Sequence, residues 1–110
     1  MILKKEDSHI IITPKNSNYS KVLFNSLNET VNSYKENNLI LDFSNLIIND
    51  QQLMEFKNIS EEKIALGTSF VIIKKNANLD ILPDEVIIVP TMQEAIDMVE
   101  MDEMTRSLDF

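Results

Sequence analysis

The sequence has no cysteine and only one glycine among its 110 residues. Without cysteine, a zinc–thiolate site, thiol catalysis and a disulfide framework are all excluded. A loop that cradles a phosphate group needs several glycines, so Gly67 alone cannot build one. Gly67 directly follows a helical pattern. This position predicts that it ends a helix in the left-handed conformation, where the missing Cβ removes a steric cost.

Histidine is also nearly absent, because His9 is the only one. Acid–base or nucleophilic catalysis needs a base with a suitable pKa and a partner group, and no nucleophile or second metal ligand lies at motif spacing from His9. We therefore interpret His9 as a surface or strand-end residue. The acidic side chains near the C-terminus fall on one predicted helix, where they form a solvated face. We predict no catalytic residue, no metal and no cofactor, and hence no enzymatic activity.

Long hydrophobic runs are missing as well. The longest, such as Val86–Val89, have the length of a strand and are far shorter than a membrane span. The apolar start Met1-Ile2-Leu3 runs directly into Lys4-Lys5-Glu6-Asp7, so no signal peptide is predicted. These features predict a soluble, cytoplasmic protein that does not associate with membranes.

Positive charge is scarce, and the imbalance is concentrated at one end. The formal net charge is -8, and residues 91–110 contribute -5 of it, with six acidic residues against Arg106. An acidic chain repels the phosphate backbone, and no basic stripe with interleaved aromatic residues is present, so nucleic-acid binding is disfavoured. The charge favours a protein partner with a basic surface.

Apolar patterns predict the secondary structure. β-branched and apolar runs indicate strands at residues 9–13, 39–43, 70–73 and 86–89, and the short run 2–4 is compatible with a fifth. Spacings of three and four predict helices at residues 18–36, 53–59 and 60–66, the last with Ser60 as its cap. Strands separated by helices are typical of an α/β fold, and we predict one domain, 1–110, with a mixed sheet of four to five strands covered by helices.

The C-terminal segment begins with a helix signal. Thr91 and Glu94 have the spacing of a capping box, which predicts a helix from Met92 and an acidic, Met-rich helix and tail from about residue 91. The core-facing residues of this helix are expected to be Met92, Ala95, Ile96 and Val99. Beyond Asp102 the pattern loosens, and a second apolar stripe is formed by Met101, Met104, Leu108 and Phe110. We predict residues 101–110 to be the main interaction segment.

Two acidic residues near the third strand have local roles in our interpretation. Asp42 lies at the strand end, where a carboxylate commonly accepts hydrogen bonds from nearby backbone amides, although a buried functional carboxylate is the alternative. Asp50 precedes an apolar helical pattern and is interpreted as the N-cap of that helix. The amides of Gln51 and Gln52 follow it, so the Asp50–Gln52 turn is a second candidate for partner binding.

The stretch Leu41-Asp42-Phe43-Ser44, with Asp50 eight positions after Asp42 and an apolar helix beyond, resembles the core of the STAS domain. This family includes bacterial anti-sigma factor antagonists and cytoplasmic domains of sulphate transporters. The later order of elements, with the Gly67 turn, two further strands and Pro90-Thr91 before a helix, extends the resemblance over roughly residues 9–100. It implies a STAS-like sheet and a regulatory role in protein binding.

The sequence departs from the family at its regulatory site. The family has Asp-Ser-Ser-Gly at the helix start, and a partner kinase phosphorylates the second serine. Here Gln51 and Gln52 stand in place of the serines, and Leu53 stands in place of the glycine. No phosphorylation is expected at Gln51 or Gln52, because glutamine has no hydroxyl. The helix between the last two strands is also shortened, to residues 78–81, so the resemblance implies a degenerate, non-enzymatic STAS-like interaction module.

The acidic ending, residues 94–110, resembles short Bacteroidetes proteins that are labelled ribonuclease Z. That label implies a metallo-β-lactamase nuclease with a histidine-rich zinc motif, whereas this chain has one histidine. We interpret the label as an association and not as an activity. The alternatives to an interaction module are therefore an accessory protein or subunit in RNA processing of the ribonuclease Z type, and a small self-associating structural protein such as a homodimer.

Overall fold

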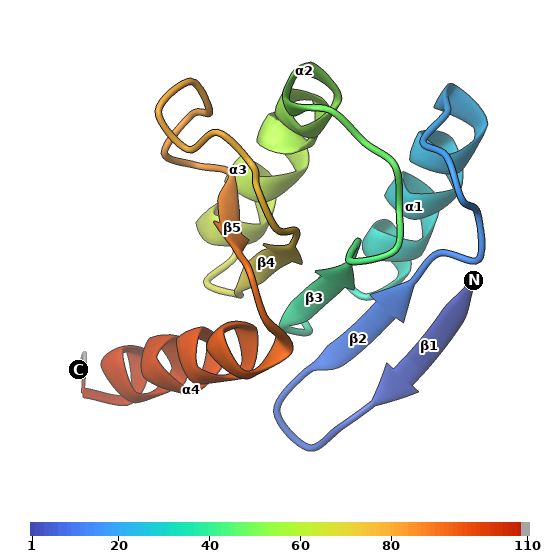
Figure 1. Cartoon of the computed structure of the whole chain (residues 1–110). Coiled ribbons are helices and arrows are strands. Elements are labelled where there is room, and N and C mark those ends of the chain that lie inside the picture. Colours follow the sequence, from blue (N-terminus) through green and yellow to red (C-terminus); the bar gives the residue numbers. More distant parts are fainter. Residues whose placement is uncertain (109–110) are drawn as a thin grey trace.

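The computed structural model describes residues 1–108 and contains one five-stranded sheet in the order β1-β2-β3-β4-β5 (Figure 1). The strands are β1 (Ile2–Lys5), β2 (Ile10–Thr13), β3 (Leu39–Asp42), β4 (Phe70–Ile73) and β5 (Ile87–Val89). β1 pairs with β2 in the antiparallel sense, and the other three pairs are parallel. The predicted α/β fold with a mixed sheet is confirmed, and the short run at the N-terminus is its fifth strand.

The helices cover both faces of this sheet. α1 (Lys21–Ser33), α2 (Asp50–Leu53), the 3-10 turn η1 (Met54–Phe56) and α3 (Lys57–Ala65) contribute to a core on one face, whereas α4 (Met92–Leu108) packs on the other face. Alternate residues of β3 belong to the two cores: Leu39 and Leu41 face the core formed with α1, α2 and α3, and Ile40 faces α4. The central strand is therefore buried on both sides, as its unbroken apolar run predicts.

The first helix is shorter than predicted. It begins at Lys21 and not at Asn18, because the Ser20 side chain caps it by accepting a hydrogen bond from the Leu23 backbone N–H at 3.1 Å. The preceding residues stay extended, since the Tyr19 N–H donates to the Ile47 carbonyl at 3.0 Å. Tyr19 keeps its apolar contacts with this core from outside the helix, which explains why it fits the helical spacing.

The predicted boundary at Ser60 is wrong. α3 runs through this position without a break, and the buried Ser60 hydroxyl donates to the Glu85 carbonyl in the loop before β5. The serine therefore satisfies a carbonyl of another segment instead of starting a helix. The end of this helix is as predicted, because Gly67 has a φ of 76° and its N–H donates to the Ile64 carbonyl at 3.0 Å.

The connection between β4 and β5 is built from turns. Asn76 adopts a φ of 64°, a conformation that asparagine tolerates better than most residues. The shortened helix expected at residues 78–81 is absent from this described connection, and Leu82 and Val86 are buried in its place. Two apolar anchors thus hold the loop against the first core without a helix.

Candidate functional site

The start of α4 is fixed by its cap. The Glu94 N–H donates to the Thr91 hydroxyl oxygen at 3.2 Å, and that hydroxyl donates to the Glu94 carboxylate at 2.9 Å. The helix begins at Met92 as predicted, although the Glu94 carboxylate accepts from the Thr91 hydroxyl and not from a backbone N–H. Ala95 and Val99 are fully buried against the sheet, and Met92 and Ile96 pack partly buried beside them. The predicted core face is therefore confirmed.

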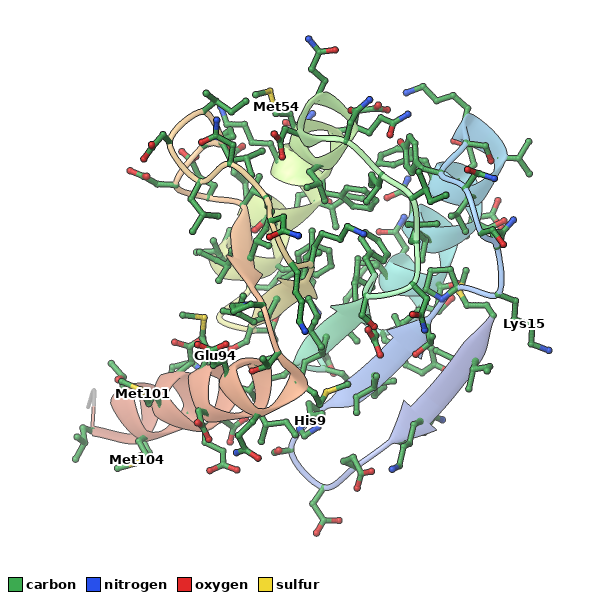
Figure 2. The ribbon with its side chains drawn as sticks, viewed as in Figure 1. His9, Lys15, Met54, Glu94, Met101 and Met104 are labelled. Carbon is green, nitrogen blue, oxygen red and sulfur yellow. The ribbon has the colours of Figure 1, made fainter. Side chains whose placement is uncertain are left out.

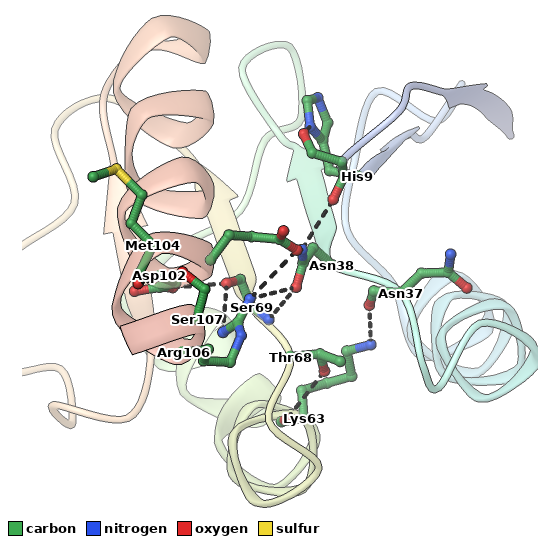
Figure 3. A network of polar contacts seen from close by, with 12 residues as sticks. His9, Asn37, Asn38, Lys63, Thr68, Ser69, Asp102, Met104, Arg106 and Ser107 are labelled. Carbon is green, nitrogen blue, oxygen red and sulfur yellow. Dashed lines mark hydrogen bonds and ion pairs between the residues drawn. The ribbon is translucent and has the colours of Figure 1, made fainter. Parts of the chain in front are cut away.

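A polar network holds the second half of α4 on the sheet (Figure 3). At its centre is the buried Asn38, directly before β3, whose Oδ1 accepts from the Ser69 N–H at 2.8 Å and from Arg106 Nη2 at 3.1 Å. The Asn38 amide nitrogen donates to the Ser8 carbonyl at 2.9 Å and to the Glu103 carboxylate at 2.6 Å. One side chain thus joins β2, β3, β4 and α4.

Ser69 and Asp102 form a second link. The Ser69 hydroxyl, which is buried before β4, donates to the Asp102 carboxylate at 2.7 Å. Together the two links attach Asp102, Glu103 and Arg106 to the edge of the sheet where β3 and β4 begin. This explains why the helix continues to Leu108, beyond the point where the apolar pattern loosens.

The opposite face of the same helix carries exposed apolar side chains. Met101 is 66% exposed, Met104 65% and Leu108 76%. A helix advances about 100° per residue, so these three positions share one face that points away from the face of Ala95 and Val99. We call Met101, Met104 and Leu108 the methionine stripe, and Figure 2 labels both methionines on the C-terminal half of α4. Phe110, the predicted fourth member, lies outside the described residues.

The surroundings of the methionine stripe are acidic. Asp97, Glu100 and Glu103 are exposed on the same helix. Arg106, the one basic residue of α4, points into the polar network and lies 3.7 Å from the Glu103 carboxylate. The exposed face therefore presents negative charge around an apolar centre.

The Asp50 turn differs from its predicted arrangement. Asn49, and not Asp50, is the N-cap of α2: its side chain accepts from the Gln52 N–H at 2.8 Å, and the Gln52 side chain accepts from the Asn49 N–H at 2.9 Å. Asp50 is the first helical residue, and its carboxylate accepts from the Asn78 N–H at 3.1 Å. Gln51 is exposed, whereas the Gln52 amide oxygen is engaged in the cap.

Asp42 has the local role that its position predicts. Its Oδ1 accepts from the Ser44 N–H at 3.1 Å and from the Ser44 hydroxyl at 2.5 Å. The structure thus confirms a strand-end carboxylate that stabilises the following turn. Asp42 is the last residue of β3 and Asp50 follows it, whereas the network around Asn38 lies at the beginning of that strand, so the two candidate segments lie at opposite ends of the strands (Figure 1).

His9 lies directly before β2, at a strand end as predicted, but it is buried, with 7% of its surface exposed, and is not a surface residue. Its Nδ1 lies 2.8 Å from the Ser8 hydroxyl, and its Nε2 is buried without a hydrogen-bond partner among the described residues. Within residues 1–108, no group of three or more acidic or histidine side chains could hold a metal ion. Over the same range, no helix is long and apolar enough to cross a membrane.

Besides the network around Asn38, two further polar clusters were not predicted. The ammonium group of the buried Lys63 donates to the carbonyls of Tyr34, Lys35 and Asn37, and burial lowers the pKa of Lys63 to about 8. It thereby satisfies carbonyls after the end of α1. A lysine in an amphipathic helix is normally solvated, so the sequence offers no signal for this contact.

The second cluster joins the start of α1 to η1. The Tyr19 hydroxyl donates to the Glu55 carboxylate at 2.9 Å, and the Lys21 ammonium pairs with the same carboxylate. Burial, and then the hydrogen bond to Glu55, raise the pKa of Tyr19 above its ordinary value. The hydrogen bond from Lys21 lowers the pKa of Glu55. These groups fasten two elements of the first core.

Comparison of the chain with models of known protein families and with curated proteins found no match. The candidate binding surfaces are the methionine stripe of α4 and the Asp50–Gln52 turn. Of these, the methionine stripe combines exposed apolar area, a rigid support and a charged surround.

Proposed function

We propose that this protein is a non-enzymatic, cytoplasmic interaction module that binds a protein partner through the methionine stripe of α4. The observation that carries the proposal is the exposure of Met101, Met104 and Leu108 on a helix whose opposite face is fixed to the sheet. A rigid helix with an apolar face suits docking into a groove of another protein.

The energetics favour a binding surface. Fully burying one large apolar side chain contributes about 1.5–3 kcal/mol, so covering the three residues of the stripe is a substantial gain on association. The network around Asn38 already orders the helix, so a partner need not supply the free energy for folding it. Methionine side chains also adapt to the shape of a partner because they are unbranched and polarizable.

The charge around the stripe selects the kind of partner. Exposed Asp97, Glu100 and Glu103 would attract a groove with a basic rim and accelerate association in a salt-dependent manner. Two copies of α4 packed through this face would bring like charges together, which opposes a homodimer at this surface. The same charge opposes binding of nucleic acid.

The relation to the STAS domain is part of the proposal. Its support is the resemblance around Asp42 and Asp50, together with the mixed sheet in which β1 precedes a series of parallel strands. Gln51 and Gln52 leave no hydroxyl for a kinase at the start of α2. We therefore propose a degenerate STAS-like module whose binding is independent of phosphorylation at this turn, and in which the Asp50–Gln52 turn is a secondary contact at most.

Capture of the partner tests this function. The tagged protein, with a Met104→Asp or Leu108→Asp substitution, is compared with wild type for the proteins that it retains from a lysate of its own host, measured by quantitative mass spectrometry. Val22→Asp is the matched control, because Val22 is 76% exposed on α1. The stripe variants are expected to lose the partner that wild type and Val22→Asp retain. Equal capture by all four proteins would overturn the proposal.

A further inference from the structure

An open cavity of about 370 Å³ lies beside α4, between its second half, the start of β4, β5 and the turn after α3. Its apolar walls come from Ile64, Phe70, Val71, Ile87 and Met98. Its polar lining comes from Thr68 and from Ser69, Asp102 and Arg106, the last three being members of the network that holds the helix. The cavity therefore joins an apolar body to a small group of fixed polar atoms, which is the usual composition of a ligand site.

The lining favours an aromatic ring. A thioether such as that of Met98 makes favourable contacts with ring edges, and a guanidinium such as that of Arg106 is attracted to ring faces. Asp102 adds a hydrogen-bond acceptor: its Oδ2 accepts one bond from the Ser69 hydroxyl, and a carboxylate has further lone pairs available. A ring that carries an N–H or O–H group can use all three residues.

The cavity is large enough for an aromatic side chain. Pockets of about 300–1,000 Å³ hold drug-sized ligands, so 370 Å³ leaves room for one ring. Tryptophan and tyrosine are the aromatic side chains with a polar group, and they are also the residues most enriched at the energetic centres of protein interfaces. One indole or phenol ring therefore fits the volume of the cavity and brings a polar group to its fixed polar atoms.

Met98 connects the cavity to the methionine stripe along the helix. Met98 lines the cavity, and Met98, Met101 and Met104 follow at intervals of three residues, so that each is a surface neighbour of the next. Met98, Asp102 and Arg106 lie on the side of α4 between the stripe and the sheet, so a partner that covers Met101 reaches the cavity by extending around the helix past Met98. We propose that this cavity receives a tryptophan or tyrosine side chain of the same partner, an inference that rests on the proposed function.

Small aromatic probes test the cavity independently of any partner. The protein is labelled with ¹³C at the methionine methyl groups and titrated with indole, p-cresol and toluene while NMR spectra are recorded. Saturable shifts are expected at Met98, with little change at Met54, which packs against the core on the other face of the sheet. Toluene is expected to bind about tenfold more weakly than p-cresol, because it cannot donate a hydrogen bond to the charged acceptor.

A pair of variants assigns the acceptor. Asp102→Asn is expected to reduce the difference in affinity between p-cresol and toluene. Asp97→Asn makes the same charge change on α4 outside the cavity lining, so it should leave this difference in affinity unchanged. No saturable shift at Met98 with indole or p-cresol, up to their solubility limits, would overturn the inference even if the stripe variants lose their partner. Probe binding at Met98, combined with stripe variants that retain the partner, would instead overturn the proposed function and separate the cavity from it.

Discussion

Arg106 donates a hydrogen bond from Nη2 to Oδ1 of Asn38 at 3.1 Å, across 68 positions of sequence. The same oxygen accepts from the Ser69 backbone N–H, so a single amide connects the last turns of α4 with the starts of β3 and β4. The direction in which the methionine stripe faces is set by this contact and by the buried Ala95 and Val99.

Removing the Asn38 amide should destabilise the protein. Asn38→Leu leaves the buried Ser69 N–H without its acceptor, and an unsatisfied buried group costs about 1–3 kcal/mol. The free energy of unfolding, measured in urea by circular dichroism, is expected to fall by about that amount. Asn37→Ala is the control, because the Asn37 side chain is exposed. A loss of the same size in both variants would show that the network contributes nothing specific.

Arg106→Ala should loosen the end of α4 without unfolding the domain. The variant loses the bond to Asn38 and the ion pair with Glu103, while the face of Ala95 and Val99 stays buried. Amide hydrogen exchange is expected to accelerate in the last two turns of the helix and to stay unchanged at Val99. Equal acceleration of exchange along the whole helix would contradict the view that the network holds only the end of α4.

Truncation after Asp102 removes Glu103 and Arg106 along with part of the stripe. The shortened protein should remain folded by circular dichroism but unfold at a lower urea concentration than wild type, because half of the polar network is missing. Single substitutions in the stripe, such as Met104→Asp, should not lower this stability by more than about 0.5 kcal/mol. If they do, the stripe belongs to the core and is not a free surface.

Lys63 should produce a specific pH dependence. Burial lowers its pKa from 10.5 to about 8, so between these values the unfolded chain holds a proton that the folded protein has released. The free energy of unfolding of wild type should therefore rise with pH over this window, relative to Lys63→Met. Urea unfolding at a series of pH values measures the difference, with the exposed Lys57→Met as control. A difference that is independent of pH would contradict the lowered pKa.

The cap of α2 can be assigned by substitution. Asn49→Ala removes the side chain that accepts from the Gln52 N–H and should cost about 1 kcal/mol of stability. Gln51 is exposed in the same turn, so Gln51→Ala should change the stability little. Equal effects of the two substitutions would argue against the capping box seen at Asn49.

The sheet could be predicted from sequence because its signal is local and strong. The apolar runs of β3 and β4 are buried on both faces, and Gly67 occupies the one left-handed position at a helix end that only glycine adopts without cost. The helix cap at Thr91 could be predicted from sequence equally well, because its partner Glu94 is three residues away. In these places the residues that determine the structure are neighbours in sequence.

The predictions from sequence that were wrong also have physical reasons. Asn49 and Asp50 are both good N-caps, so their order alone does not decide which one caps α2. Ser60 and Lys63 resemble ordinary cap and surface residues, but their partners are the Glu85 carbonyl and the carbonyls after α1. The Asn38 network likewise depends on contacts between residues that are distant in sequence. Spacing patterns contain no information about such distant pairs, so the stripe was predicted but the structure that supports it was not.

The most direct measurement of the central proposal is the affinity of the purified partner, once captured, for wild type and for the Met101→Asp/Met104→Asp double variant. Isothermal titration calorimetry at low and at high salt gives both values, with Val22→Asp as the control. The double variant is expected to bind at least about tenfold more weakly, because two buried apolar contacts are lost. Wild-type binding should weaken as salt is raised, because the acidic surround is screened. Unchanged affinity of the double variant would contradict the assignment of the methionine stripe as the binding surface.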